Sequence, residues 1–412
     1  MHPLVALLKR AVATVGTRYI MAVCNFVLLL INARVLGASG LGEAGLLVAG
    51  VQIIHSFTNL IGGSSLIYFF HRHGVRRVLV IALGWGVLIS FVGPTVMSLL
   101  GLADLRQWAY SVGLSLVFVS FNSLGRTLLS YEQVGQYNFT LIMQALIAAG
   151  TTIGGYYLLE ITTPDMYIWG MLFGNGLCSL YCAALLLRRV MSEEIATTTY
   201  RTLIIQMARF GGWNMVDNVA GQVTLRINYF LLESFVGLRV VGLYEGALKL
   251  AECVLMVPRS LAPIFYASLT KMAWSLERFH VTRNYLVIVI VSVAAVLAGL
   301  LLLPEWVYTE YVFSSDFVGI KALLQLMSLG IIANGVNIII IHYFTAVGKI
   351  KQAAISTLLG SIAISISGPL LISYFSWGQY GAASSLTIAY CITALYNLII
   401  YFTKEPYTPS PR

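Results

Sequence analysis

The sequence predicts an all-α polytopic membrane protein, with about twelve transmembrane helices in two six-helix lobes that are pseudo-repeats of one another. Three observations predict this fold: an apolar composition, a regular alternation of apolar segments and breaks, and an asymmetric placement of Lys and Arg. Of the 412 residues, 58% are hydrophobic and 10% are charged, and the mean hydropathy is +0.85. A soluble globular chain carries about 25% charged residues. The shortfall therefore indicates a chain embedded in a membrane along its whole length.

The apolar segments have the length of membrane spans. A spanning helix needs about 20 mostly apolar residues, and cutting the chain at charged, Pro-rich or Gly-rich breaks leaves twelve such segments. In order they are 15–36, 41–70, 77–101, 108–129, 137–159, 166–187, 204–235, 241–268, 284–303, 320–345, 352–375 and 380–402. The second and the seventh are the longest, and we expect each of them to be tilted or broken.

The basic residues orient these spans. With the N-terminus in the cytoplasm, the cytoplasmic segments hold 18 Lys and Arg residues, Arg126 among them. The outer loops hold only Arg34, Arg106, Arg239 and Lys321. Because cytoplasmic loops are enriched in Lys and Arg, and one span more or fewer would reverse every later loop, we predict a multi-pass protein with both termini in the cytoplasm. The net charge of +9 then reflects cytoplasmic loops and not nucleic-acid binding.

The chain divides near its middle, where the polar segment RRVMSEEIATTTYR follows the sixth span. We expect an N-terminal lobe over 1–190, a cytoplasmic linker over 191–203 and a C-terminal lobe over 204–412. The halves share a weak similarity, because VLGASGLGEAG (35–45) and FVGLRVVGLYEGA (235–247) both place glycines before a glutamate. We interpret each as a tight outer turn followed by a helix start, where a carboxylate complements the helix dipole.

These same segments resemble a known family. NFVLLLINARVLGASGLGEAG (25–45) resembles the first hairpin of bacterial polysaccharide exporters, and INYFLLESFVGLRVVGLYEGALKLAECVLMVPRSLAPIFYASL (227–269) resembles the stretch that opens their second half. The family is that of the lipid-linked oligosaccharide flippases (Wzx-like) of the multidrug/oligosaccharidyl-lipid/polysaccharide exporter superfamily. The resemblance implies a cavity between the lobes that opens alternately to each side of the bacterial inner membrane. It also implies undecaprenyl-pyrophosphate carrying a sugar repeat unit as substrate, and other polysaccharide assembly proteins as partners.

The eighth span carries charges that a lipid-facing helix would not tolerate. Glu245, Lys249, Glu252 and Arg259 fall within about 40° of one line at 100° per residue. Exposing Lys249 and Glu252 to lipid would cost on the order of 5–7 kcal/mol, and an intrahelical pair recovers only about 0.2–0.5 kcal/mol. The stripe should therefore face the protein interior or a wet cavity. Two interpretations stay open: a self-neutralised ladder, or a transport path in which Lys249 contacts the pyrophosphate and Glu245 and Glu252 hold it.

The first span offers further candidates for substrate binding. Arg18, Asn25 and Asn32 recur at seven-residue steps and so share a face. We include Arg18 and Asn25 in the substrate-binding set. The alternatives are that the asparagines hydrogen-bond between helices and that Arg18 reaches the cytoplasmic surface.

Two residues are candidates for ion coupling. His55 lies about halfway along the second span, where an imidazole is a proton-site candidate; the alternative is a neutral, hydrogen-bonded ring. Asp217 lies on the polar face of the seventh span with Asn214 and Asn228. It could bind a cation with neighbouring oxygens, or hydrogen-bond between helices.

Enzymatic motifs are missing from the sequence. There is no P-loop and no Ser-His-Asp order, and the spacing of the five cysteines fits neither a metal site nor a CxxC motif. We therefore expect no cofactor, no metal and no enzyme, and we interpret the cysteines as reduced, packed thiols. The favoured function is flipping of lipid-linked oligosaccharides for surface polysaccharide or O-antigen. One alternative is a cation-coupled multidrug exporter of the same superfamily. The other is a membrane glycan polymerase or ligase, which would need a large outer loop that this chain lacks.

Overall fold

The computed structural model of the chain describes residues 3–191, 199–270, 272 and 275–404, and these residues form helices and short connections. The α-helices are α1 (Pro3–Ser56), α2 (Gly63–His73), α3 (Val75–Leu99), α4 (Leu105–Ser130), α5 (Val134–Leu158), α6 (Pro164–Met191), α7 (Tyr200–Phe235), α8 (Leu238–Val254), α9 (Met256–Leu269), α10 (Ser275–Leu302), α11 (Ile320–Ala346), α12 (Ile350–Pro369) and α13 (Gly378–Lys404). Short 3-10 helices, η1 (Phe57–Leu60) and η3 (Ser315–Phe317), and π-helices, η2 (Val307–Val312) and η4 (Leu370–Tyr374), connect or extend them.

The helices account for the predicted spans. Within the described residues, nine helical segments are long and apolar enough to cross a membrane, and the first of them, Gly16–Phe70, contains two predicted spans. The other two predicted spans are α7, which is rich in polar and charged residues, and the pair α8 and α9, each of which is too short alone. The protein is a multi-pass all-α membrane protein, as the sequence predicts.

Two of the spans differ from expectation in where they break. The second span is broken as predicted, because α1 ends at Ser56, η1 follows, and α2 begins at Gly63. The seventh span, expected to be tilted or broken, is not broken, since α7 runs without interruption for 36 residues, and its tilt stays a prediction. The eighth span, expected to be one helix, is divided at Leu255 into α8 and α9. Pro258 explains this division, because it has no N–H to bond the carbonyl four residues earlier.

The glycine turns predicted near 37 and 237 are present. Gly37 has φ 65° and Gly237 has φ 120°, and such values are unfavourable for any residue with a Cβ. The prediction of a carboxylate at the helix start is wrong for the glycine turn near 237. α8 begins at Leu238 and has no acidic residue in its first turn, so Glu245 lies about two turns inside the helix and does not cap its dipole.

The chain forms two compact units. The first comprises Met1–Leu36 and Glu43–Val219, and the second comprises Gly37–Gly42 and Ala220–Arg412. This division falls inside α7 and not in the predicted linker over 191–203, of which residues 192–198 lie outside the described chain. The lobe boundaries given by the sequence stay a prediction.

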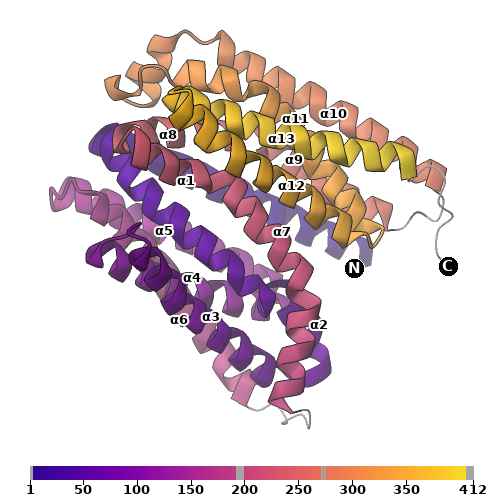
Figure 1. Ribbon diagram of the computed structural model, residues 1–412. Coiled ribbons are helices and arrows are strands. Elements are labelled where there is room, and N and C mark those ends of the chain that lie inside the picture. The colour runs from indigo at the N-terminus through magenta and orange to yellow at the C-terminus, as the bar shows by residue number, and fades with distance from the viewer. Residues whose placement is uncertain (1–2, 192–198, 271, 273–274, 405–412) are drawn as a thin grey trace. The chain divides into compact units, whose positions relative to one another are not determined.

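The two units use the same packing scheme. In the first, α4 packs against α2, α3, α5 and α6, and α5 packs against α6. In the second, α11 packs against α9, α10, α12 and α13, and α12 packs against α13 (Figure 1). Helices at the same rank in the chain therefore take the same roles, with α4 and α11 at the centre of each unit. This correspondence gives the weak similarity between the halves a physical meaning.

A close crossing of backbones lies within the second unit, between residues 37–42 and the start of α8. A Cβ on Gly42 would overlap the carbonyl oxygen of Leu238, and a Cβ on Gly242 would overlap the carbonyl oxygen of Ala38. Glycine at both positions allows the two segments to touch through their main chains.

Candidate functional site

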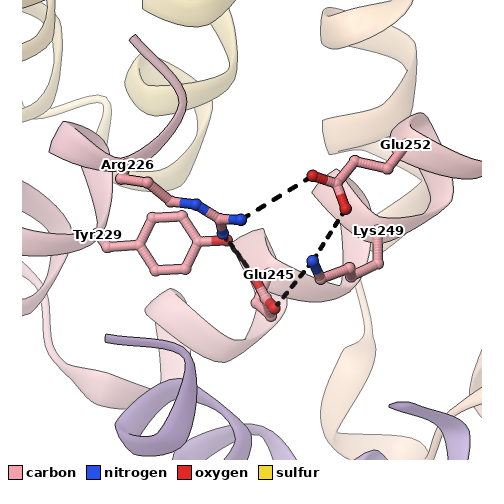
Figure 2. Close-up of polar contacts among 5 residues, drawn as sticks. All are labelled: Arg226, Tyr229, Glu245, Lys249 and Glu252. Carbon is pink, nitrogen blue, oxygen red and sulfur yellow. Dashed lines mark hydrogen bonds and ion pairs between the residues drawn. The ribbon is translucent and has the colours of Figure 1, made fainter. Parts of the chain in front are cut away.

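The charged stripe of the eighth span forms contacts along α8. The Nζ of Lys249 lies 2.9 Å from a carboxylate oxygen of Glu252 and 3.8 Å from one of Glu245 (Figure 2). The spacings of three and four residues place the three side chains on one face of the helix. Both predicted carboxylates therefore hold Lys249, as the sequence analysis required of either interpretation.

Two side chains of α7 complete the cluster. Arg226 places Nη1 3.8 Å from Glu245 and Nη2 4.0 Å from Glu252, and its Nη1 donates a hydrogen bond of 3.0 Å to the hydroxyl of Tyr229. The hydroxyl of Tyr229 in turn donates to the carboxylate of Glu245. We call Arg226, Tyr229, Glu245, Lys249 and Glu252 the charge network; Figure 2 shows how α7 and α8 contribute to it.

Burial divides the charge network into two parts. Arg226, Tyr229 and Glu245 are 3%, 0% and 7% exposed. The side chains of Lys249 and Glu252 are 29% and 20% exposed, so this pair is the more accessible part of the network. A small pocket beside Glu252 is also lined by Arg259, Thr387 and Tyr390. We call the buried residues Arg226, Tyr229 and Glu245 the base of the network. The more exposed pair, Lys249 and Glu252, is its accessible edge.

Formal charges in the network cancel, because two cations face two carboxylates. Removing such charges from water is unfavourable unless each has a partner, and each of the four contacts at least one opposite charge. Lys249 contacts both glutamates as in the ladder interpretation, but the charges cancel only with Arg226 of α7, so the choice between the two interpretations stays open. That the accessible edge lines a transport path stays a prediction.

The remaining predicted site residues lie in the first unit, whereas the charge network lies in the second. Arg18 and Asn25 are on α1, and both are exposed. His55 is partly buried near the end of α1, with its ring edge against Phe118. Asp217 is partly buried on α7. Of the seven predicted residues, the structure brings together Glu245, Lys249 and Glu252.

Sequence reasoning missed Arg226 and Tyr229. An arginine within an apolar span was a usable signal, as was a tyrosine one turn further on. Asn228, which we placed on the polar face of the seventh span, is fully buried and donates hydrogen bonds to Ala382 O at 2.9 Å and Ser385 Oγ at 3.1 Å. It joins α7 to α13, as expected of an asparagine between membrane helices.

Known proteins share this architecture, although no match is found by sequence. No family model matches the sequence, and a search of curated proteins also finds no match. Among solved structures, the inward closed conformation of the lipid II flippase MurJ matches with a TM-score of 0.70 and 15% identity, over 96% of this chain and 88% of that chain. An inward-facing multidrug resistance MATE transporter of the MOP superfamily matches with a TM-score of 0.69 and 13% identity, over 90% of this chain and 92% of that one. The chain has the MATE/MurJ fold.

A eukaryotic transporter structure matches the chain over a similar length. The MATE transporter AtDTX14 matches with a TM-score of 0.64 and 12% identity, over 97% of this chain and 96% of that chain. The MATE/MurJ fold thus spans nearly the whole chain. The solved structures that share it are transporters and a flippase, and not enzymes.

Proposed function

We propose that the protein is a non-enzymatic flippase that moves undecaprenyl-pyrophosphate-linked oligosaccharides across the bacterial inner membrane by alternating access, for surface polysaccharide or O-antigen synthesis. The observation that carries this proposal is the partly exposed pair of Lys249 and Glu252 on α8, which together with α9 corresponds to the eighth predicted span. The resemblance of 25–45 and 227–269 to polysaccharide exporters supports it. So does the shared fold with MurJ, whose structure is described as a lipid II flippase.

The charge network suggests how the substrate would be held. Lys249 is bonded to Glu252 at the accessible edge, so an arriving pyrophosphate can take the place of that carboxylate. Glu245 would remain against Arg226 and Tyr229 and keep the base in position. Phosphate attracts an ammonium group far more strongly in a poorly hydrated site than in bulk water. The polyprenyl tail would stay in lipid, and Arg18 and Asn25 remain further proposed substrate-binding residues.

Coupling to an ion is part of the same proposal. An anion that joins a neutral network adds negative charge, and uptake of a proton or cation would balance it. His55 and Asp217 are the residues we propose for this role. Both are ionisable groups within membrane-spanning helices, which are commonly functional there.

A second candidate is a cation-coupled exporter of drugs. The observation that favours it is that Glu252 lines a pocket beside Tyr390, since carboxylates and aromatic rings suit cationic, apolar ligands. The two functions differ in the charge of the cargo, so a transport assay with one cargo of each sign separates them.

Loss of Lys249 is expected to stop transport of the anionic cargo. In proteoliposomes, Lys249→Ala should lower the rate of lipid-linked oligosaccharide flipping at least about tenfold, because a charge-assisted contact of ~1.5–3 kcal/mol is lost. Lys249→Arg should keep part of the rate, and Glu252→Gln should be milder because the cation remains.

Lys321→Ala is the matched control, since Lys321 bonds a main-chain oxygen at Leu303 outside the charge network. Normal flipping by Lys249→Ala, or recovery of flipping in the double variant Lys249→Ala, Glu252→Ala, would reduce the pair to a structural ion pair. Transport of a cationic dye with no flipping of the glycolipid by the wild type would favour the exporter.

The proposed membrane orientation has its own test. Arg201 and Asp316 are both exposed in the structure, so a cysteine at either position is limited only by the side of the membrane it faces. In a variant without native cysteines, an impermeant thiol reagent added outside cells should label Asp316→Cys and leave Arg201→Cys unlabelled. The reverse labelling would overturn the predicted topology.

A further inference from the structure

The first unit contains an arginine, within a membrane helix, that forms no ion pair with any acidic residue the structure describes. Arg126 lies on α4, the central helix of that unit, and its side chain is partly buried. None of the carboxylates in the described residues forms an ion pair with it. An uncompensated charge at such a place is unfavourable, and charges inside membrane proteins commonly mark ligand sites.

Three polar groups from separate segments meet beside Gly63. A Cβ on Gly63 would lie 2.6 Å from Asn59 Oδ1, 3.2 Å from Arg126 Nη1 and 3.3 Å from Asn214 Nδ2. These atoms come from η1, α4 and α7, and Gly63 itself has φ 60°. Any side chain at position 63 would clash with Asn59, so glycine allows the three groups to converge closely on the start of α2. We call Asn59, Gly63, Arg126 and Asn214 the Gly63 cluster.

The surroundings of the Gly63 cluster favour negative charge. Gly63 begins α2, and Gly62 before it supplies no side-chain cap, so the helix dipole places partial positive charge beside the cluster. The Nδ1 of His55, one turn before Asn59 in the chain, is buried and has no hydrogen-bond partner within the described chain. Asn59 Oδ1 is the acceptor of the group and suits a hydroxyl of the same ligand.

Arg126 does not have the placement of a side chain that only reaches for the membrane surface. It sits one turn before the end of α4 at Ser130, and the sequence analysis counted it with the cytoplasmic charges. A snorkelling arginine would extend its guanidinium towards that end. Here Nη1 is instead directed to the first residue of α2.

The repeat shows that this cation is particular to the first unit. Both units break their second span, at η1 in the first and at Leu255 in the second, and transporters commonly bind ligands at discontinuous helices in corresponding positions. Aligning the ends of α4 and α11 places His342 at the position of Arg126. The Nδ1 of His342 lies 2.7 Å from Ile338 O on its own helix, so that side chain is already engaged.

We propose that the Gly63 cluster is a second anion site, which binds a phosphate group. A guanidinium can bind a phosphate through two parallel hydrogen bonds, and Asn214 Nδ2 and the first turn of α2 add further donors. The phosphate can belong to a lipid-linked pyrophosphate or to a soluble phosphate compound. This site is separate from Lys249, and its existence does not depend on what the protein transports.

The test uses purified full-length protein in detergent and a Lys249→Ala background, which removes the candidate site of the second unit. Titration calorimetry with geranyl pyrophosphate and with inorganic pyrophosphate should show binding in this background. Adding Arg126→Gln should weaken binding at least about tenfold, and adding Asn214→Ala should weaken it several-fold. Arg201→Gln, which removes an exposed arginine, should have no effect. Tighter binding of geranyl pyrophosphate identifies a lipid-linked ligand, and equal binding identifies a soluble one.

Thermal unfolding separates a ligand site from a structural arginine. Because Arg126 forms no ion pair with the described part of the chain, Arg126→Gln should keep or raise the unfolding midpoint of the ligand-free protein. A lowered midpoint with unchanged binding would overturn the proposal. Absence of pyrophosphate binding in the Lys249→Ala background would also overturn it, while leaving the proposed flipping through Lys249 intact.

Discussion

Replacing Arg226 by methionine is expected to destabilise the second unit by about 3–5 kcal/mol, the usual cost of removing one partner of a buried ion pair. Arg226 is 3% exposed and contacts both Glu245 and Glu252. Without it, Glu245 keeps the hydroxyl of Tyr229 and a distant Lys249 at 3.8 Å. The thermal unfolding midpoint in detergent and the yield of monodisperse protein measure the loss.

A second substitution tests the physical reason. In the Arg226→Met background, Glu245→Gln removes the uncompensated carboxylate, so it should recover part of the lost stability and give a positive coupling in a double-mutant cycle. Arg259→Met is the control, because Arg259 is exposed on α9 and has no ion pair among the described residues. Equal losses from Arg226→Met and Arg259→Met would show that the network does not stabilise the fold.

Gly242→Ala is expected to prevent correct folding. The new methyl group would occupy the position of the carbonyl oxygen of Ala38, a main-chain atom that cannot turn aside as a side chain could. Overpacking of interiors costs typically about 1–3 kcal/mol, and more where no side chain can move. We expect loss of monodisperse protein, or a midpoint lowered by more than that of the Arg259→Met control.

A matched glycine makes the result interpretable. Gly299 lies in α10, and a Cβ there would meet no atom within 4 Å. Gly299→Ala should therefore be neutral or slightly stabilising, since alanine favours a helix over glycine. Wild-type behaviour of Gly242→Ala would mean that the two segments can separate without cost.

The sequence predicted those features that depend only on the length of apolar segments and on the spacing of residues along one helix. The twelve spans follow from the length of apolar runs, and the contacts of Lys249 follow from its spacing to Glu245 and Glu252. These are local properties, because helix geometry alone sets which residues share a face. A break or a tilt of the second span was also predictable, since the segment is longer than one span needs.

Features that depend on the length of a side chain, or on contacts between residues far apart in the sequence, could not be predicted in this way. The spacing of residues along α7 gives no sign that the long side chain of Arg226 reaches Glu252 on α8. The division at Leu255 depends on a missing hydrogen bond at Pro258, which the hydropathy of the segment conceals. The Gly63 cluster joins residues 59, 126 and 214, and only the folded chain reveals that they meet.

The grouping of Gly37–Gly42 with the second unit has a consequence for biosynthesis. This segment leaves the ribosome roughly two hundred residues before its contact partners at Leu238 and Gly242 are made. During that interval residues 37–42 lie in the membrane without the main-chain contacts that they later make with α8. The second unit therefore cannot be completed by the residues after Ala220 alone. A chain expressed as two pieces, cut after the sixth span, should accordingly yield a stable second piece only when the first is made in the same cell.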